Sequence, residues 1–354
     1  MSVDSVGVLR RLIPRGALLR TAAPVLVSVF ALGLLTPSWS VATLILIYAI
    51  AAMGCNLLLG FTGLLSIGQS VYFGIGGYFA AITATRWGLQ MSSAMILSAV
   101  LCAGVAVFIG AFAIRRLEIY FVMITFAFAE TAQFLAYVFK DYTGGENGVG
   151  GVPIASFGAF GQSFFIAPPG PKFYYMMAVL SVLVFVILQR FVDSPVGAVL
   201  VAIRENESRA EAMGYSVKAY KLLAFMVSGA VTGIAGGLYA FFVGSASISG
   251  IQIDMAITIV IITVLGGTRS LYGSFLGAVA YVVLNTYLSD VWPYWQMLLG
   301  FALIAIVLAF KGGLHGATLT LFDLVRRGLH RGTQAGPGER IVHIVQSGGA
   351  NADR

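Results

Sequence analysis

The chain has 354 residues, of which 59% are hydrophobic and only 10% carry a charge. Soluble globular domains carry roughly a quarter charged residues, so this composition excludes a soluble protein and predicts an integral membrane protein. The formal net charge of +7 does not indicate nucleic-acid binding, because the basic residues lie at the ends of apolar segments, as they do in membrane proteins.

The apolar segments predict an all-α membrane protein with about ten transmembrane helices, since a helix needs roughly 20 residues to cross the hydrocarbon. We expect an N-terminal arm over 1–20, a transmembrane domain over 21–310 and a partly mobile tail over 311–354. Because two segments are short, about eight or nine crossings remain possible if one of them is re-entrant. The segments lie at about 21–36, 41–59, 70–85, 93–114, 119–139, 173–191, 221–242, 255–265, 275–288 and 295–310.

The distribution of basic residues predicts the orientation. With ten crossings, only Arg86, Lys140 and Lys172 of the 21 Lys and Arg residues fall on the side opposite the termini. Cytoplasmic loops carry the excess of Lys and Arg in multi-pass proteins, so both termini are expected to be cytoplasmic.

A run rich in glycine and small polar residues interrupts the apolar pattern at residues 60–69, and a second run does so at 264–273. We call them the first break and the second break. Backbone that leaves the helix at membrane depth is tolerated where it is buried in protein or lines a cavity. Paired interruptions in two halves of a chain point to a transport pathway. The alternative is that both are tight turns at the cytoplasmic surface.

Four polar residues are candidates for lining such a pathway. Ser66, Gln69 and Tyr72 lie at or just after the first break, and Glu130 lies near the middle of the fifth span. A carboxylate at that depth costs roughly 2.5–3.5 kcal/mol on the insertion scale, so it predicts a functional or a bonded structural role. We favour a structural or pathway-lining role over proton coupling, because a proton relay needs several ionisable groups and the spans hold few others.

The longest predicted external connection runs over residues 140–172 and is rich in glycine between 143 and 151. Connections of this length are usually functional or disordered. We expect this one to receive a partner or to order the mouth of the pathway.

Residues 193–221 are the one long charge-dense stretch in the interior of the chain, and we call them the charged segment. A short helix is predicted over about 194–214, because Pro195 suits the first helical position and Gly214 suits a left-handed end. Its polar face mixes acidic and basic residues, which fits docking on a soluble protein better than adsorption to lipid. The alternative is a solvated loop between two spans. The charged residues are Asp193, Arg204, Glu205, Glu207, Arg209, Glu211, Lys218 and Lys221.

The spans show no pattern for catalysis or metal binding. His315, His330 and His343 all follow the last predicted span, so no span supplies imidazole as a base or a metal ligand. The phosphate-binding pattern GxxxxGK followed by Ser or Thr is absent, since no lysine follows a glycine. We therefore predict that the chain is not an enzyme, has no catalytic residue and binds no metal or nucleotide.

Several motifs together resemble one transporter family. They are GFTGLLSIGQSVYFGIGGY at 60–78, RLEIYF at 116–121, TGGENG at 143–148, AIRENESRAEAMG at 202–214, YKLLAF at 220–225 and LGGTRSLYGSFLG at 265–277. In this combination the chain resembles the permease subunits of bacterial branched-chain amino acid ABC importers, of the LivM type. The likeness covers most of residues 41–310, and Gln69 stands where His is common in that family.

The resemblance implies a type II-like ABC importer permease in the bacterial inner membrane. The implied partners are a homologous second permease, two ATPase subunits that carry ATP and Mg²⁺, and a periplasmic binding protein that delivers the substrate. The implied substrates are branched-chain or related amino acids, although urea, amides and aromatic or other carboxylates are handled by the same family. The implied coupling helix that docks on an ATPase contains Ala202, Arg204, Glu205, Asn206, Glu207, Arg209, Ala210 and Gly214.

Three functions compete on these observations: the membrane subunit of an ATP-driven importer, a secondary transporter in which Glu130 carries protons, and a membrane-embedded enzyme or scaffold. The lack of span histidines, clustered carboxylates and a nucleotide loop disfavours the enzyme. The charged segment separates the other two, because a secondary transporter has no motor to receive it. We therefore expect the importer subunit.

Overall fold

The computed structural model describes residues 28–316, apart from 30–31, 34–35, 37, 116–117, 154, 160–161, 168–169, 292–293 and 310–312. The predicted arm over 1–20, most of the first predicted span and most of the predicted tail, including His330 and His343, lie outside the described residues. The chain divides into two compact units, Met1–His315 and Gly316–Arg354, and the elements below all belong to the first.

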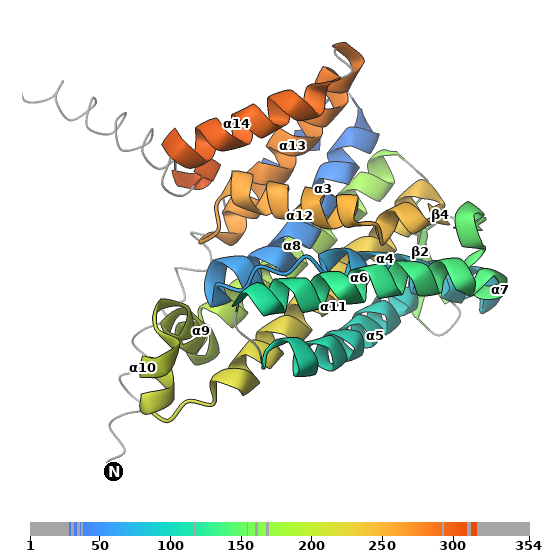
Figure 1. The fold of residues 1–354 in the computed structure, drawn as a ribbon. Helices are drawn as coiled ribbons and strands as arrows, with labels where there is room; N and C mark the ends of the chain where they lie inside the picture. The colour runs from blue at the N-terminus through green and yellow to red at the C-terminus, as the bar shows by residue number, and fades with distance from the viewer. Residues whose placement is uncertain are drawn as a thin grey trace, which may run out of the picture. The chain divides into compact units, whose positions relative to one another are not determined.

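Helices dominate the described part of the chain (Figure 1). In order they are α3 (Trp39–Asn56), α4 (Gln69–Arg86), α5 (Met91–Ala113), α6 (Glu118–Val138), α7 (Lys140–Thr143), α8 (Pro171–Val192), α9 (Pro195–Glu205), α10 (Glu207–Ala212), α11 (Val217–Val243), α12 (Ile253–Gly266), α13 (Leu271–Val291) and α14 (Trp295–Ala309). Short π or 3₁₀ helices are η1 (Leu57–Thr62), η2 (Gly145–Asn147) and η3 (Ile248–Gly250), and the strands are β1 (Val149–Gly150), β2 (Ala155–Ala159), β3 (Gln162–Ala167) and β4 (Ser245–Ala246).

Six helices among the described residues are long and apolar enough to cross a membrane: α3 continued by η1, then α5, α6, α8, α11 and α13. The helical membrane fold is therefore confirmed. Helix α12 is short, at 14 residues, as the sequence predicts. The expectation of a short span at 275–288 is wrong, because α13 is a helix of 21 residues. Its first and last turns contain small polar residues, Ser274 and Ser289, which a sequence pattern assigns to loops.

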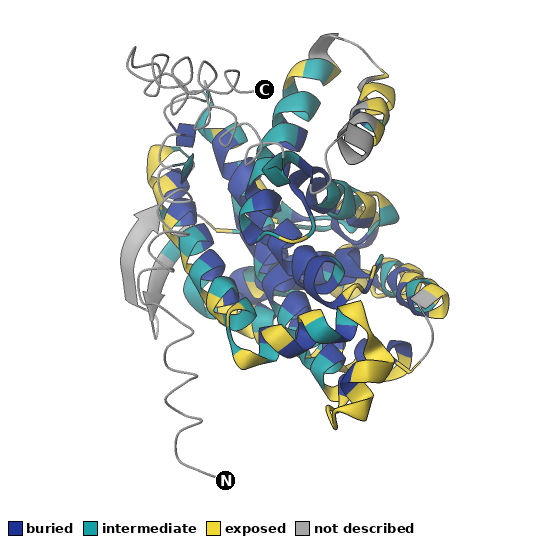
Figure 2. Cartoon of the chain, turned by 90° about the vertical axis from the view of Figure 1, so that its left-hand side faces the viewer, coloured by how far each residue is buried: buried dark blue, intermediate teal, exposed yellow. Residues whose placement is uncertain are grey.

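Helix α3 is the centre of the bundle. In the apolar stretch formed by α3 and η1, 89% of the residues are buried within the protein. Helix α3 contacts α8, α11, α12 and α13. The helix contains no charged residue and is apolar on all sides, which is the pattern of a helix surrounded by protein. Figure 2 shows the buried residues concentrated in the middle of the bundle.

Helices α4 and α11 approach each other closely because glycines line their interface. A Cβ atom on Gly76 would lie 2.2 Å from the carbonyl oxygen of Gly233, and one on Gly236 would lie 1.8 Å from that of Phe73. Small residues permit such backbone-to-backbone packing between membrane helices. The helix that opens after the first break is thereby fixed against the helix that follows the charged segment.

The external connection predicted over 140–172 holds more structure than the sequence indicates. Strands β2 and β3 form an antiparallel hairpin. Strand β1 pairs with β4, with Val149 opposite Ala246 and Gly150 opposite Ser245. This second pairing joins segments that are far apart in sequence, and local residue patterns carry no signal for it.

Candidate functional site

The charged segment forms two helices, α9 and α10, so the prediction of a single helix over 194–214 is wrong at Asn206. That residue has an extended backbone (φ −160°, ψ 103°), and its side chain accepts a hydrogen bond of 2.9 Å from the backbone N–H of Arg209. An asparagine in this position caps the start of a new helix. The predicted start at Pro195 and the left-handed end at Gly214 (φ 88°) are confirmed.

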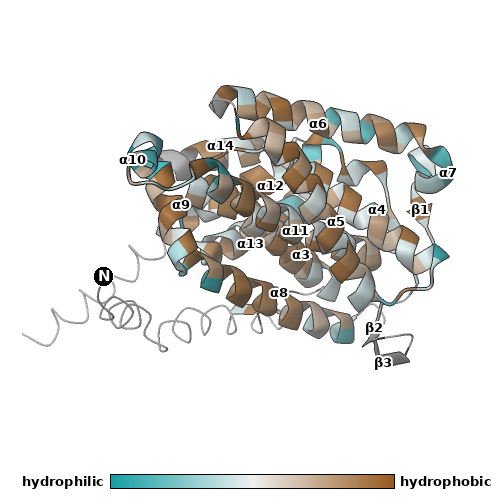
Figure 3. Ribbon diagram, turned by 90° about the horizontal axis from the view of Figure 1, so that it is seen from below, coloured by the Kyte–Doolittle hydropathy of each residue, from teal (hydrophilic) through white to brown (hydrophobic). Residues whose placement is uncertain are grey.

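The apolar stripe of α9 and α10 holds the two helices on the protein. Val199, Ile203, Ala210 and Val217 form one buried cluster, with Tyr220 packed against it. Leu200 of α9 joins a larger cluster beneath the bundle helices. Figure 1 shows α9 and α10 at one end of the bundle, and Figure 3 shows that α10 is mainly hydrophilic.

The residues implied for ATPase docking divide between two faces. Ala210 is buried, and Ala202 and Arg204 are half-buried. The remaining members of the set are exposed, namely Glu205, Asn206, Glu207, Arg209 and Gly214. The exposed residues can reach a partner, whereas Ala210 and Arg204 contact other parts of this chain.

Arg204 connects the charged segment to the first break. Its Nη1 donates a hydrogen bond to the carbonyl oxygen of Gly60, and its side chain passes beside Gly63, where a Cβ atom would lie 3.1 Å from Arg204 Cγ. Burial lowers the pKa of Arg204, the nearby Arg269 lowers it further, and Glu205 acts in the opposite direction. An arginine keeps its proton under these conditions, so a positive charge is held beside the first break.

Glu207 and Lys221 join α10 to the start of α11. The Lys221 Nζ lies 2.6 Å from Glu207 Oε2, and the lysine side chain is only 10% exposed whereas that of the glutamate is 51% exposed. The carboxylate therefore neutralises an ammonium group that has little access to water.

Replacing Glu207 with Gln is expected to loosen α10, because Lys221 then loses its ionic partner. A loss of about 1 kcal/mol would raise the exchange rate of the α10 amide protons roughly fivefold. Hydrogen exchange measured by mass spectrometry tests this, with Glu211→Gln as the matched control, since Glu211 is exposed on the same helix. Equal exchange in the two variants would show that the ion pair does not hold α10.

The two breaks pack against each other. The first begins within the π-helix η1 and continues into the turn after it, where Gly63 has φ 77°, and the second contains Gly267 with φ 114°. A Cβ atom on Gly60 would lie 1.8 Å from the carbonyl oxygen of Thr268. Both interruptions predicted from the sequence are therefore present, and the fold brings them together.

Asn56, four residues before the first break, is hydrogen-bonded to the second break. It is fully buried at the end of α3. Its Nδ2 lies 3.3 Å from the carbonyl oxygen of Gly267, 2.9 Å from that of Ser270 and 2.9 Å from Ser274 Oγ. One amide thus satisfies backbone groups that the second break leaves outside any helix.

Of the residues predicted to line a pathway, Gln69 is fully buried between three helices. Its Nε2 donates to Ser228 Oγ (3.1 Å), and its Oε1 accepts from Thr232 Oγ1 (2.9 Å). Ser228 Oγ in turn donates to the carbonyl oxygen of Gly54 (2.6 Å). Gln69 therefore links α4 to α11 directly and to α3 through one hydroxyl group.

The other three pathway candidates lie in different surroundings. Ser66 is buried and accepts a hydrogen bond from the backbone N–H of Gly68 (3.2 Å). Tyr72 is buried, and its ring meets that of Phe225 edge-on at 5.8 Å. Glu130 is exposed on α6. The structure thus groups Ser66, Gln69 and Tyr72 around the start of α4 and leaves Glu130 apart from them.

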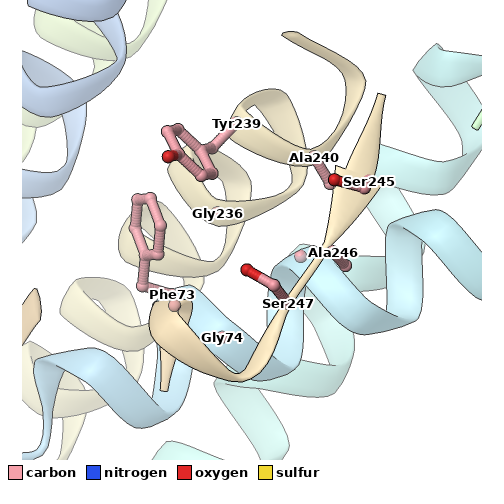
Figure 4. Close-up of a pocket in the computed structure, with 10 residues that line it drawn as sticks. Phe73, Gly74, Gly236, Tyr239, Ala240, Ser245, Ala246 and Ser247 are labelled. Carbon is pink, nitrogen blue, oxygen red and sulfur yellow. The ribbon is translucent and has the colours of Figure 1, made fainter. Parts of the chain in front are cut away.

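A small pocket lies between the first half of α4 and the last turns of α11, beside the β4 strand (Figure 4). The rings of Phe73 and Tyr239 stand 5.5 Å apart at its wall. Gly74, Gly236 and Ser247 also line it. It has space for about one water molecule, which is too little for an amino acid in this conformation.

Sequence reasoning missed Asn56, Ser228 and Thr232, which make the polar contacts of the two helix breaks. The signal for Asn56 was present, because it is the one side-chain amide in the apolar run from 39 to 59. Hydroxyl residues such as Ser228 and Thr232 are common in membrane helices, so their role depends on the helix pairing that places them beside Gln69.

Comparison with known proteins agrees with this architecture. A family model described as branched-chain amino acid transport system / permease component matches residues 39–308. The chain is 28% identical to the high-affinity branched-chain amino acid transport system permease protein LivM of Escherichia coli K12 over 315 residues, which cover 83% of this chain and 73% of that protein.

Two further relatives are more distant. The probable branched-chain amino acid transport permease protein LivM of Methanocaldococcus jannaschii is 24% identical over 284 residues, covering 70% of this chain and 80% of that protein. The ribose import permease protein RbsC of Haemophilus influenzae is 27% identical over 149 residues, covering 40% of this chain and 45% of that protein. No solved structure matches the chain.

Proposed function

Because the chain belongs to the permease component family of branched-chain amino acid transport systems, we propose that it is the membrane subunit of an ATP-driven importer for branched-chain or related amino acids. Separate ATPase subunits dock on α9 and α10 from the cytoplasm and carry the ATP and Mg²⁺. A second permease of the same family completes the membrane part, and a periplasmic binding protein delivers the substrate. The protein lies in the inner membrane, and both of its termini are on the cytoplasmic side.

The observation that carries the proposal is the two-sided character of α9 and α10. Glu205 and Arg209 are exposed, and mixed charges of this kind suit a soluble protein partner. On the inner side, Arg204 donates to the carbonyl oxygen of Gly60. A partner that shifts α9 therefore acts directly on the first break.

The contacts continue from the first break into the second. Gly60 lies against the backbone of Thr268, and Asn56 bonds Gly267 and Ser270. Such a chain of packed and hydrogen-bonded groups can pass a displacement between distant parts of a protein. We assign Ser66, Gln69 and Tyr72 to the substrate pathway, which opens and closes as these contacts move. Glu130 is exposed on α6, apart from these three residues, and we do not place it in the pathway.

Substituting Glu205 or Arg209 with Ala is expected to uncouple ATP hydrolysis from uptake, because each removes a charge from the docking face and leaves the buried stripe intact. Uptake of labelled leucine, isoleucine and valine by the assembled importer should fall roughly tenfold, while the complex still forms and hydrolyses ATP. Uptake and ATPase rates measured in the same proteoliposomes test this.

Lys218→Ala is the matched control, because Lys218 is also exposed but lies outside the predicted coupling helix. Normal uptake by both the Glu205 and the Arg209 variants would remove the docking role of α9 and α10. Uptake by the purified chain alone, driven by a proton gradient without ATPase subunits, would instead establish a secondary transporter.

A further inference from the structure

Helix α6 carries a carboxyl group at membrane depth on its outer surface. Glu130 lies twelve residues after Glu118 and eight before Val138, about 18 Å and about 12 Å from the two ends of the helix. The side chain is exposed, and it has no hydrogen bond or ion pair to the residues that the structure describes. This position lies well inside a hydrocarbon layer about 30 Å thick.

The exposed face around Glu130 has the spacing of a helix-packing seam. Residues on it recur at alternating intervals of four and three, which is the repeat by which one helix packs along another. All of them are exposed, and we call them the α6 stripe: Met123, Ala127, Glu130, Phe134 and Tyr137. Ala127 beside Glu130 leaves room for a close approach, as small residues do in membrane helix interfaces.

The rest of the bundle covers α6 very little. Only 22% of the residues in its apolar stretch are buried, which is the smallest share among the six long apolar helices described. Figures 1 and 3 both show α6 at the outside of the bundle. The residues that the structure describes therefore leave the α6 stripe largely uncovered.

Lipid alone is a poor cover for this face. A glutamate has a short side chain and cannot reach the headgroups across about 12 Å, and a carboxylate exposed to hydrocarbon costs roughly 2.5–3.5 kcal/mol. Helix α8, at the opposite edge of Figure 3, differs from α6 in this respect. The exposed residues in its middle, Val179, Leu183 and Ile187, are all apolar, as expected of a surface that faces lipid.

The depth of Glu130 also excludes a soluble partner, because only a membrane-spanning helix can reach it. We propose that the α6 stripe is the surface on which the second permease subunit packs. That subunit places a small residue opposite Ala127 and a hydrogen-bond donor, from a hydroxyl or amide side chain, against Glu130. The inference rests on the proposed function, since it takes the second permease from there.

Photo-crosslinking in the assembled importer tests the surface. A benzophenone amino acid is placed at Met123 or Phe134, which leaves Ala127 and Glu130 intact, and at Leu183 in α8, at a depth between those two, as a control. We expect adducts with the second permease from Met123 and Phe134 and only lipid adducts from Leu183. Lipid adducts alone from the α6 positions, adducts between two copies of this chain, or second-permease adducts from Leu183 alone would each overturn the inference.

A second measurement addresses the carboxyl group itself. Glu130→Gln keeps a hydrogen-bonding group and should retain the second permease, whereas Glu130→Leu should lower its co-purification roughly threefold to tenfold. Unchanged or higher retention with Glu130→Leu would show that Glu130 makes no contact with that subunit.

ATP-dependent uptake is measured in the same samples. If uptake persists while the crosslinks fail, only the surface is wrong; if uptake needs no ATP, the proposed function is wrong.

Discussion

Replacing Gly60 with Ala is expected to destabilise the protein by about 3 kcal/mol and to abolish uptake. The added Cβ atom would lie 1.8 Å from the carbonyl oxygen of Thr268 and 2.1 Å from Asn56 Oδ1, far inside van der Waals contact. The first obstacle is backbone of the second break, so no side-chain rotation relieves the clash. The two breaks must separate, and the hydrogen bond from Arg204 to Gly60 is displaced with them.

The measurement is the temperature at which the purified protein loses its monodisperse peak in size-exclusion chromatography, together with uptake by the assembled importer. Gly104→Ala is the matched control, because Gly104 lies within α5 and a Cβ atom there would meet nothing within 4 Å. Alanine favours a helix over glycine by roughly 1 kcal/mol, so the control should be at least as stable as the parent. A Gly60→Ala protein as stable as the control would show that the breaks are not packed as described.

Replacing Asn56 with Asp is expected to destabilise the protein by more than about 3 kcal/mol. The side chain keeps nearly the same shape, but the substitution buries an unpaired charge. The Nδ2 group donates toward two carbonyl oxygens and one hydroxyl oxygen. A carboxylate oxygen in its place would face these acceptors with no proton to offer. Even the protonated acid could donate only once, so buried carbonyl groups would remain without a partner.

The same thermal assay tests this substitution, and Asn147→Asp is its control, since Asn147 is exposed in the connection between α6 and α8. The cost in the Asn56 variant should shrink as the assay pH falls, because protonation removes the buried charge. A small and pH-independent effect would mean that Asn56 does not hold the second break.

Much of the fold could be predicted because membrane spans leave a strong signal. The apolar runs that became α5, α6, α8 and α11 are long and almost uncharged. The two breaks were equally visible, because Gly63 and Gly267 stand among other small residues and adopt positive φ angles that other residues avoid. These features depend on a few neighbouring residues, and local physics is enough to read them.

Features that depend on contacts between residues distant in the sequence could not be predicted. Nothing near Asn206 separates a mid-helix asparagine from one that caps a new helix, so the charged segment was predicted as one helix. Arg204 was grouped with the docking residues by the resemblance to the transporter family, whereas its guanidinium group faces the carbonyl oxygen of Gly60 in the bundle. Glu130 was found by its depth in the span, but its exposed position on α6 required the helix arrangement.

The pairing of β1 with β4 has a consequence for variation in this part of the chain. The ladder is made by main-chain groups, which every residue except proline provides equally. Many other residues can therefore take part in the pairing at Gly150 and Ser245, whereas Val149 and Ala246 also pack in a small apolar cluster, which limits what can replace them. A single inserted or deleted residue would shift the register of the pairing by one and turn the flanking side chains to the wrong face, so the length of each segment is constrained at all four positions.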